Sequence, residues 1–198
     1  LSNKDKIVSV DLDWDIETIV VRTDKETNYE DKLKKKIRTS GCAVGTMFAD
    51  VMDIFDKIIL SKKVKFHTSW LAGLLKIINT QPSLYLKAGA IHACVLCKKN
   101  EPIIYVEDVG RHNAIDKIAG WLWYNKRSMD DLILYTTGRL TSEMVIKTVQ
   151  MKIPILISRS GFTAAGVDLA KKSNLTLIGR AKGKRFVALS GLDRIIYD

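Results

Sequence analysis

Apolar residues recur at two spacings along the chain, and the spacing changes at regular intervals. Short apolar runs favour β-strands, and they alternate with longer stretches in which apolar residues recur every three or four positions, as in amphipathic helices. Three strands lead through short polar loops into helices: 103–106 into 111–125, 131–135 into 141–151, and 154–157 into 163–172. This alternation predicts a layered α/β domain with a substantially parallel sheet.

Further elements flank these three pairs. They are a helix near 47–58, a helix over 68–79, a hairpin of strands at 90–98 and 103–106, and strands at 175–179 and 185–189. The first 36 residues differ, because two strand-like stretches at 7–10 and 17–21 precede a charge-dense run. We therefore divide the chain into an N-terminal region at 1–36 and an α/β domain at 37–198.

Composition narrows the function classes. The 198 residues suit one domain with a small appendage, and no apolar run approaches the roughly 18–20 residues of a membrane helix. No signal peptide is visible, and three cysteines, an odd number, favour a reducing cytoplasm over a disulfide scaffold. The 32 Lys and Arg against 22 Asp and Glu give a net charge of +10, which favours an anionic partner: nucleic acid, a phosphate-bearing ligand or an acidic protein.

Each of the three strand-to-helix loops contains a glycine and an arginine. The pairs are Gly110 with Arg111, Gly138 with Arg139, and Gly161 with Arg159. In open α/β sheets, ligands bind beyond the carboxyl ends of the strands, beside helix N-termini whose amide groups suit phosphate. A basic run at 180–185 follows the last parallel strand. Together these loops predict a site for a large anionic ligand at one edge of the sheet.

The cysteines divide into one loop residue and one pair. Cys42 lies between Gly41 and Gly45 and near Arg38, where a thiol with a lowered pKa could act as a nucleophile; a free cysteine in a turn is the alternative. Cys94 and Cys97 have the spacing of a metal or redox pair, but on a strand residues three apart point to opposite faces. We predict that this pair is buried in the core.

The roles of His92 and of the segment 107–117 stay open at this point. His92 begins a predicted strand and suits either a core histidine or a ligand contact. The segment 107–117 gathers ionisable residues around one strand-to-helix turn, with His112 and Asp116 on one helix face. An acid–base pair, a ligand contact and a structural network all fit this segment.

Several motifs resemble the FdhD family of formate dehydrogenase accessory sulfurtransferases, in the family's order and over about residues 38–187. They are GAIHA at 89–93, DVGRHNAIDKIAG at 108–120, TGRLTSEMVIK at 137–147, IPILISRSG at 153–161 and LTLIGRAKGKRF at 175–186. The resemblance implies a three-layer, mixed-sheet α/β fold like that of cytidine deaminases. The deaminase zinc motifs are absent from the sequence, so we expect no metal site.

The resemblance also implies a function. Family members take persulfide sulfur from a cysteine desulfurase and pass it to a molybdenum or tungsten bis-(molybdopterin guanine dinucleotide) cofactor, which formate dehydrogenase needs. We accordingly expect a cytoplasmic homodimer with no permanently bound cofactor, for which guanosine diphosphate mimics the ligand. Family members are usually longer at the N-terminus, so the resemblance leads us to expect that residues 1–36 are the remnant of a longer region.

The family's site residues map onto this chain by motif. Cys42 matches the first cysteine of the family's Cys-x-x-Cys loop, and Gly45 stands where the second would be. We therefore expect sulfur transfer that uses Cys42 as the one cysteine of this loop. The cofactor-binding residues expected from the resemblance and the loops are Arg180, Ala181, Lys182, Gly183, Lys184, Arg185, Arg111, His112, Arg139, Arg159 and His92.

Two other functions compete with sulfur transfer. A non-catalytic chaperone that binds and delivers the guanine dinucleotide cofactor also fits, because Gly45 replaces a cysteine. A nucleic-acid binder would explain the net charge of +10 but not the glycine–arginine loops, and no basic stripe interleaved with aromatic residues is evident. We therefore expect neither a nucleic-acid nor a membrane partner.

Overall fold

The computed structural model describes residues 6–26, 36–38, 46–48, 52, 54–127 and 131–198. The chain divides into two compact units, Leu1–Ile37 and Arg38–Asp198, and each is described by itself. The assignment of separate roles to residues 1–36 and 37–198 stays a prediction. Within the described part of the chain, no helix has the length and hydropathy needed to cross a membrane.

The first unit contains an antiparallel hairpin of β1 (Ile7–Asp13) and β2 (Thr18–Thr23). Its register pairs Asp13 with Thr18 next to the turn and Ile7 with Thr23 at the far end. Both strands were expected from the sequence; β1 ends three residues and β2 two residues beyond the expected stretch.

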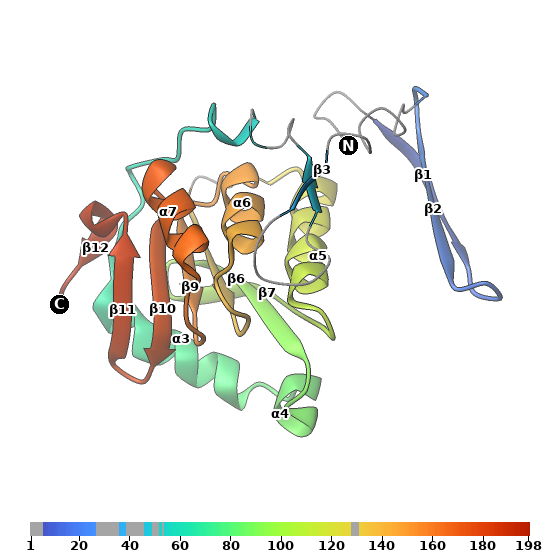
Figure 1. The fold of residues 1–198 in the computed structure, drawn as a ribbon. Coiled ribbons are helices and arrows are strands. Elements are labelled where there is room, and N and C mark those ends of the chain that lie inside the picture. Colours follow the sequence, from blue (N-terminus) through green and yellow to red (C-terminus); the bar gives the residue numbers. More distant parts are fainter. Residues whose placement is uncertain (1–5, 27–35, 39–45, 49–51, 53, 128–130) are drawn as a thin grey trace. The chain divides into compact units, whose positions relative to one another are not determined.

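The second unit is built on a six-stranded mixed sheet in the order β11-β10-β9-β8-β6-β7 (Figure 1). The strands are β6 (His92–Lys98), β7 (Glu101–Asp108), β8 (Leu132–Thr136), β9 (Ile155–Ser158), β10 (Thr176–Lys182) and β11 (Arg185–Ser190). β8, β9 and β10 are parallel, whereas β6 runs antiparallel to both of its neighbours and β11 runs antiparallel to β10. The predicted α/β class with a mixed sheet is confirmed, but the sheet is less parallel than the alternation of elements predicted, because only two of its five strand pairings are parallel.

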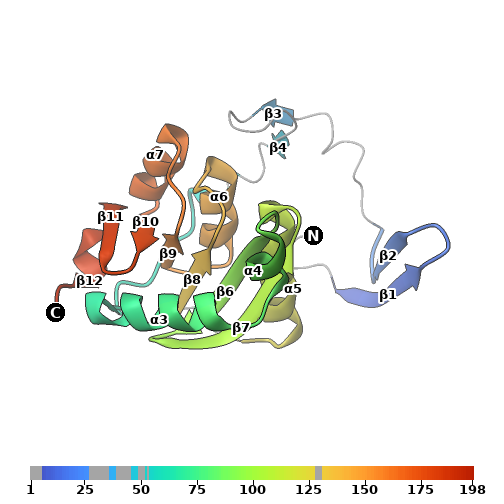
Figure 2. The same ribbon diagram turned by 90° about the horizontal axis from the view of Figure 1, so that it is seen from below.

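Helices cover both faces of this sheet (Figure 2). They are α3 (Thr68–Thr80), α4 (Leu84–Ala88), α5 (Arg111–Tyr124), α6 (Ser142–Gln150) and α7 (Ala164–Lys172). Leu134 and Leu156 lie in one buried cluster with α5, α6 and α7, whereas Ile133 and Ile155 lie in another with α3. Because both faces are buried, the central strands are apolar throughout rather than alternating.

The predicted helix near 47–58 is wrong at its start. The short strand β4 occupies Thr46–Phe48, and the chain turns after Phe55. A short apolar run fits a strand as well as a helix, so spacing alone could not separate the two here. The remaining short elements are β3 (Lys36–Arg38), β5 (Phe66–His67), the 3-10 helix η1 (Leu192–Arg194) and β12 (Ile195–Ile196).

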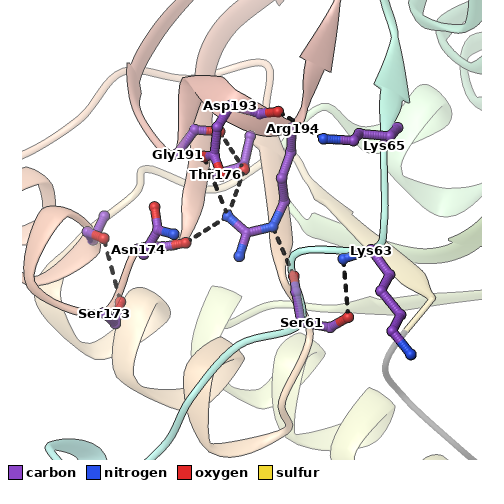
Figure 3. A network of polar contacts seen from close by, with 10 residues as sticks. Ser61, Lys63, Lys65, Ser173, Asn174, Thr176, Gly191, Asp193 and Arg194 are labelled. Carbon is purple, nitrogen blue, oxygen red and sulfur yellow. Dashed lines mark hydrogen bonds and ion pairs between the residues drawn. The ribbon is translucent and has the colours of Figure 1, made fainter.

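A buried arginine fixes the C-terminal segment (Figure 3). Arg194 is fully buried; its Nε donates to Ser61 O at 2.8 Å, and its Nη1 donates to Asn174 O at 2.7 Å. The hydroxyl of Thr176 donates to Gly191 O at 2.7 Å, and Gly191 has a φ of 61°, the left-handed conformation that glycine tolerates. These bonds tie η1 to the loop before α3 and to the start of β10.

Replacing the buried guanidinium should therefore destabilise the protein. We expect Arg194→Met to lower the free energy of unfolding by about 2–4 kcal/mol, because Ser61 O and Asn174 O lose their donors in a buried setting. The matched control, Arg185→Met at an exposed position of β11, should change it by less than about 0.5 kcal/mol. Urea unfolding measures both, and equal effects would contradict this role of Arg194.

Candidate anion-binding site

The loops that carry the arginines predicted to bind an anion converge at one edge of the sheet. Thr136 and Ser158 end the parallel strands β8 and β9 side by side, and Cys94 of β6 lies opposite Thr136. Next to them, Asp108 at the end of β7 pairs with His92 at the start of β6. The loops after β7, β8, β9 and β10 therefore leave the sheet at the same edge, as the order of elements in the sequence predicts.

Hydrogen bonds between these loops hold them in place. Ser158 Oγ donates to Gly138 O at 2.6 Å, and Ser160 Oγ donates to Thr137 O at 2.9 Å. The backbone N–H of Arg180 donates to Ser160 O at 2.8 Å. The loop after β9 is thus bonded to the loop after β8 and to β10. A ligand at this edge would meet groups that are already ordered, which reduces the entropy cost of binding.

One of the glycines makes room for an arginine from another loop, and a second lies beside an arginine of β10. A Cβ atom at Gly138 would lie 2.8 Å from Cβ and 3.1 Å from Cδ of Arg111, which follows β7. A Cβ atom at Gly161 would lie 3.9 Å from Nε of Arg180, which belongs to β10. The loop after β8 therefore lies against the arginine that follows β7, and the loop after β9 lies beside the arginine of the neighbouring strand β10, which the spacing along the sequence does not reveal.

Arg180 also has an uncommon backbone conformation. Its φ is 53°, in the left-handed region that costs a non-glycine residue roughly 1–2 kcal/mol. The bond from its N–H to Ser160 O and the irregular register of β10 between Gly179 and Lys182 accompany this conformation. Strained residues of this kind concentrate at functional sites, so the conformation supports a role for Arg180 in binding.

The other basic residues of the predicted site are exposed, whereas the alanine in the run 180–185 is buried. Arg139, Lys182, Lys184 and Arg185 are exposed, and Gly183 forms the β10–β11 turn with a φ of 61°. Arg159 is exposed as well, and its Nη1 donates to the hydroxyl of Tyr85 at 3.4 Å. Ala181 instead is buried in the cluster beneath α3, so its methyl group does not face solvent.

The two predicted histidines lie at the same edge. His92 is half-buried, and burial together with the charge of Arg111 lowers its pKa. His112 Nε2 lies 2.8 Å from Glu143 Oε2, and burial lowers the pKa of His112 although the carboxylate of Glu143 opposes the shift. Lowered pKa values favour neutral imidazoles at pH 7, which can accept or donate a hydrogen bond beside an anion.

Most carboxylates of the segment 107–117 serve a structural network, one of the alternatives that the sequence left open. Asp108 accepts from Gly110 N at 2.9 Å and pairs with Lys117 at 2.8 Å, and these contacts lower the pKa of Asp108 to about 2. Asp116 pairs with Lys147 of α6 at 2.6 Å. These carboxylates fix the start of α5 and its packing against α6.

Glu107 has a role that the sequence analysis missed. Its carboxylate accepts from the backbone N–H groups of Leu84 at 2.9 Å and Tyr85 at 2.7 Å, at the start of α4. The sequence did contain part of the signal for the start of α4, because serine is a preferred N-cap residue. In the structure, the side chain of Ser83 accepts a hydrogen bond from Leu86 N. The contacts of Glu107 position α4 and, through Tyr85, the side chain of Arg159.

The paired cysteines are core residues, as predicted. Cys94 and Cys97 are fully buried and belong to the clusters on opposite faces of the sheet. Burial raises the pKa of both thiols to about 12. Cys42 and Gly45 lie outside the described residues, so the predicted role of Cys42 is untested. Among the residues described, no group of three His, Cys, Asp or Glu side chains could hold a metal ion.

Comparison with known proteins gives consistent matches. The model of the FdhD/NarQ family matches residues 1–196. A sulfur carrier protein FdhD from Wolinella succinogenes is 31% identical over 159 residues, 80% of this chain and 55% of that protein; one from Nocardia farcinica is 37% identical over 127 residues, 63% and 46% of the two chains. The chain spans about half the length of the curated relatives that it matches.

A solved structure is similar over nearly the whole chain. It is the crystal structure of a protein from Desulfotalea psychrophila that is described as a formate dehydrogenase accessory protein. The TM-score is 0.72 at 25% sequence identity, with 96% of this chain and 72% of that chain covered. The similarity therefore includes the six-stranded sheet on which the loops converge.

The contact between Gly138 and Arg111 can be tested directly. We expect Gly138→Ala to destabilise the protein by about 1–3 kcal/mol, because the new methyl group would overlap Cβ of Arg111 at the start of α5. The matched control is Gly120→Ala inside α5, where nothing lies within 4 Å and alanine should stabilise the helix by about 0.5–1 kcal/mol. Thermal unfolding distinguishes them; two changes of the same sign would refute the proposed contact.

Proposed function

Because the chain belongs to the FdhD/NarQ family, we propose that it is a sulfurtransferase that carries persulfide sulfur from a cysteine desulfurase to the molybdenum or tungsten bis-(molybdopterin guanine dinucleotide) cofactor. The sulfurated cofactor would support the activity of a formate dehydrogenase, a partner suggested by the description of the similar crystal structure. The convergence of basic loops at one sheet edge is the single observation that carries the proposal. A three-layer arrangement like that of cytidine deaminases, a homodimer and a cytoplasmic location belong to the same proposal.

The chemistry of the edge suits the two pyrophosphates of this ligand. The N-termini of α5, α6 and α7 follow the converging loops, and amide groups at helix N-termini attract anions. Arg111, Arg139, Arg159 and Arg180 offer guanidinium groups that can hold phosphate oxygens through two donors, whereas Lys182 supplies a point charge. These groups would replace solvent cations around the ligand and fix its orientation.

Cys42 is the proposed sulfur carrier. Cys94 and Cys97, whose thiols have pKa values of about 12, stay protonated at neutral pH and are poor nucleophiles. The Cys42 thiolate would attack the outer sulfur of the desulfurase persulfide; the donor S–S bond breaks, the desulfurase keeps a thiolate, and Cys42 becomes the persulfide. Delivery of the outer sulfur as a sulfide ligand consumes two electrons, which a thiol reductant would supply.

Gly45 favours a second candidate function. With no second cysteine in the loop, the chain could bind the guanine dinucleotide cofactor and deliver it without transferring sulfur. The basic edge would serve both functions equally, so only a measurement of protein-bound sulfur distinguishes them.

The first test of sulfur transfer uses the three cysteines. After incubation with a cysteine desulfurase and ³⁵S-labelled cysteine, we expect the unaltered chain to hold labelled persulfide and Cys42→Ala to hold none. Cys94→Ala and Cys97→Ala, the matched controls, should keep the label because both thiols are buried. Label retained by Cys42→Ala would show that Cys42 is not the sulfur carrier. No label on the unaltered chain or on any variant would favour the chaperone function.

The second test concerns the basic edge. Replacing Arg180, Lys182 and Arg185 together by Gln should weaken binding of guanosine diphosphate at least about tenfold and reduce its salt dependence, since charged contacts to phosphate are lost. The control variant replaces three exposed lysines, Lys76, Lys152 and Lys171, and changes the net charge equally. Calorimetric titration at two salt concentrations measures both. Equal affinities would show that the edge does not bind the phosphates.

A further inference from the structure

We propose that a basic cavity at the opposite edge of the sheet binds a nucleotide-sized anion with a planar ring. The cavity has a volume of about 470 Å³, and its lining includes Lys63, Lys65, Lys98, Lys99, Trp70 and Ile133. Pockets for small ligands have volumes of about 300–1,000 Å³, so the cavity is large enough for one nucleoside phosphate.

The cavity is separate from the converging loops. Lys98 ends β6, whereas His92 begins the same strand at the other edge. At about 3.3 Å per residue, the strand sets the two residues roughly 20 Å apart. Lys98 pairs there with Leu132 at the start of β8, far from the end of β8 at Thr136. An anion held by the lysines of the cavity is therefore not the anion held by the loops.

Among the charged side chains of the lining, positive charge is in excess. Four lysines and one aspartate, Asp131, leave an excess of three positive charges with histidine neutral. Lys98 Nζ lies 2.6 Å from Asp131 Oδ2, and Lys65 Nζ donates to Asp193 O at 2.9 Å. Lys63 and Lys99 are exposed at the cavity. The excess favours an anion, and lysine binds phosphate as a compact point charge.

An aromatic side chain forms another part of the lining. The ring of Trp70 lies 4.7 Å from that of His67 and meets the ring of Phe66 edge-on at 6.3 Å, measured between centroids. Trp70 is half-buried and lines the cavity together with Val64 and Ile133. An indole held in this way offers a fixed apolar surface on which a heterocyclic ring can stack, with little preference among bases.

The wall of the cavity is braced by the C-terminal segment. Arg194 Nε donates a hydrogen bond to Ser61 O, and Lys65 Nζ donates one to Asp193 O, as Figure 3 shows. Beyond them, β5 pairs in parallel with β12, and His67 Nδ1 lies 2.8 Å from Asp198 Oδ2. Lys65 and the indole of Trp70 are thus already positioned, which reduces the cost of binding.

Adenosine monophosphate is a suitable probe, because it combines a planar base with one phosphate. We expect calorimetric titration of the full chain to show saturable binding, and adenosine and inorganic phosphate to bind at least about tenfold more weakly. Trp70→Leu should weaken binding of adenosine monophosphate about tenfold, as should the double variant Lys63→Gln with Lys99→Gln. Inorganic phosphate binding as tightly as the nucleotide would refute the role of the ring.

Two controls locate the binding. The charge-matched double variant Lys152→Gln with Lys171→Gln, outside the cavity lining, should bind the nucleotide like the unaltered chain. The variant with Arg180, Lys182 and Arg185 replaced by Gln removes the charges of the loops and should still bind the nucleotide at the cavity. Loss of all binding in that variant, or unchanged binding in both cavity variants, would overturn the proposal. The lysine pair is exposed, so the test stands even if Trp70→Leu does not fold.

Discussion

The shared direction of four strands is the constraint on which the candidate site depends. β8, β9 and β10 are parallel, and β7 runs the same way because β6 is antiparallel to both β7 and β8. All four strands therefore end at one edge, and every loop that carries a predicted arginine starts there. Hydrogen bonds among Ser158, Ser160 and the loop after β8 then fix the spacing of those loops. Without this shared direction the same arginines would be divided between two edges.

The sequence predicts the sheet well because the packing that stabilises it leaves a clear pattern. Burial of both faces produces the apolar runs of β8 and β9, and α6 has one buried face, so those boundaries are predicted within one or two residues. Cys94 and Cys97 are a second case, since alternation along a strand is sufficient to place them on opposite faces. The spacing of apolar residues along the chain thus predicts a helix or strand well where that element is regular.

Other features depend on contacts between distant residues and could not be predicted. The five-residue helix α4 is too short for periodicity, and it depends on Glu107, more than twenty positions away. The pairing of β5 with β12 joins residues about 130 positions apart. That Gly138 accommodates Arg111 rather than its own neighbour Arg139 follows from the sheet, not from the spacing of the motif. The burial of Ala181 likewise follows from its side of β10.

The central claim is that a polyphosphate ligand at the converging loops comes within reach of the Cys42 sulfur. A crystal structure of the full chain with guanosine diphosphate tests it most directly. The account predicts phosphate oxygens about 2.7–3.2 Å from guanidinium groups of the loops after β7, β8 and β9 and of β10, with the Cys42 side chain facing the distal phosphate. Converging loops without a bound nucleotide, or Cys42 on the far side of the sheet from these loops, would contradict it.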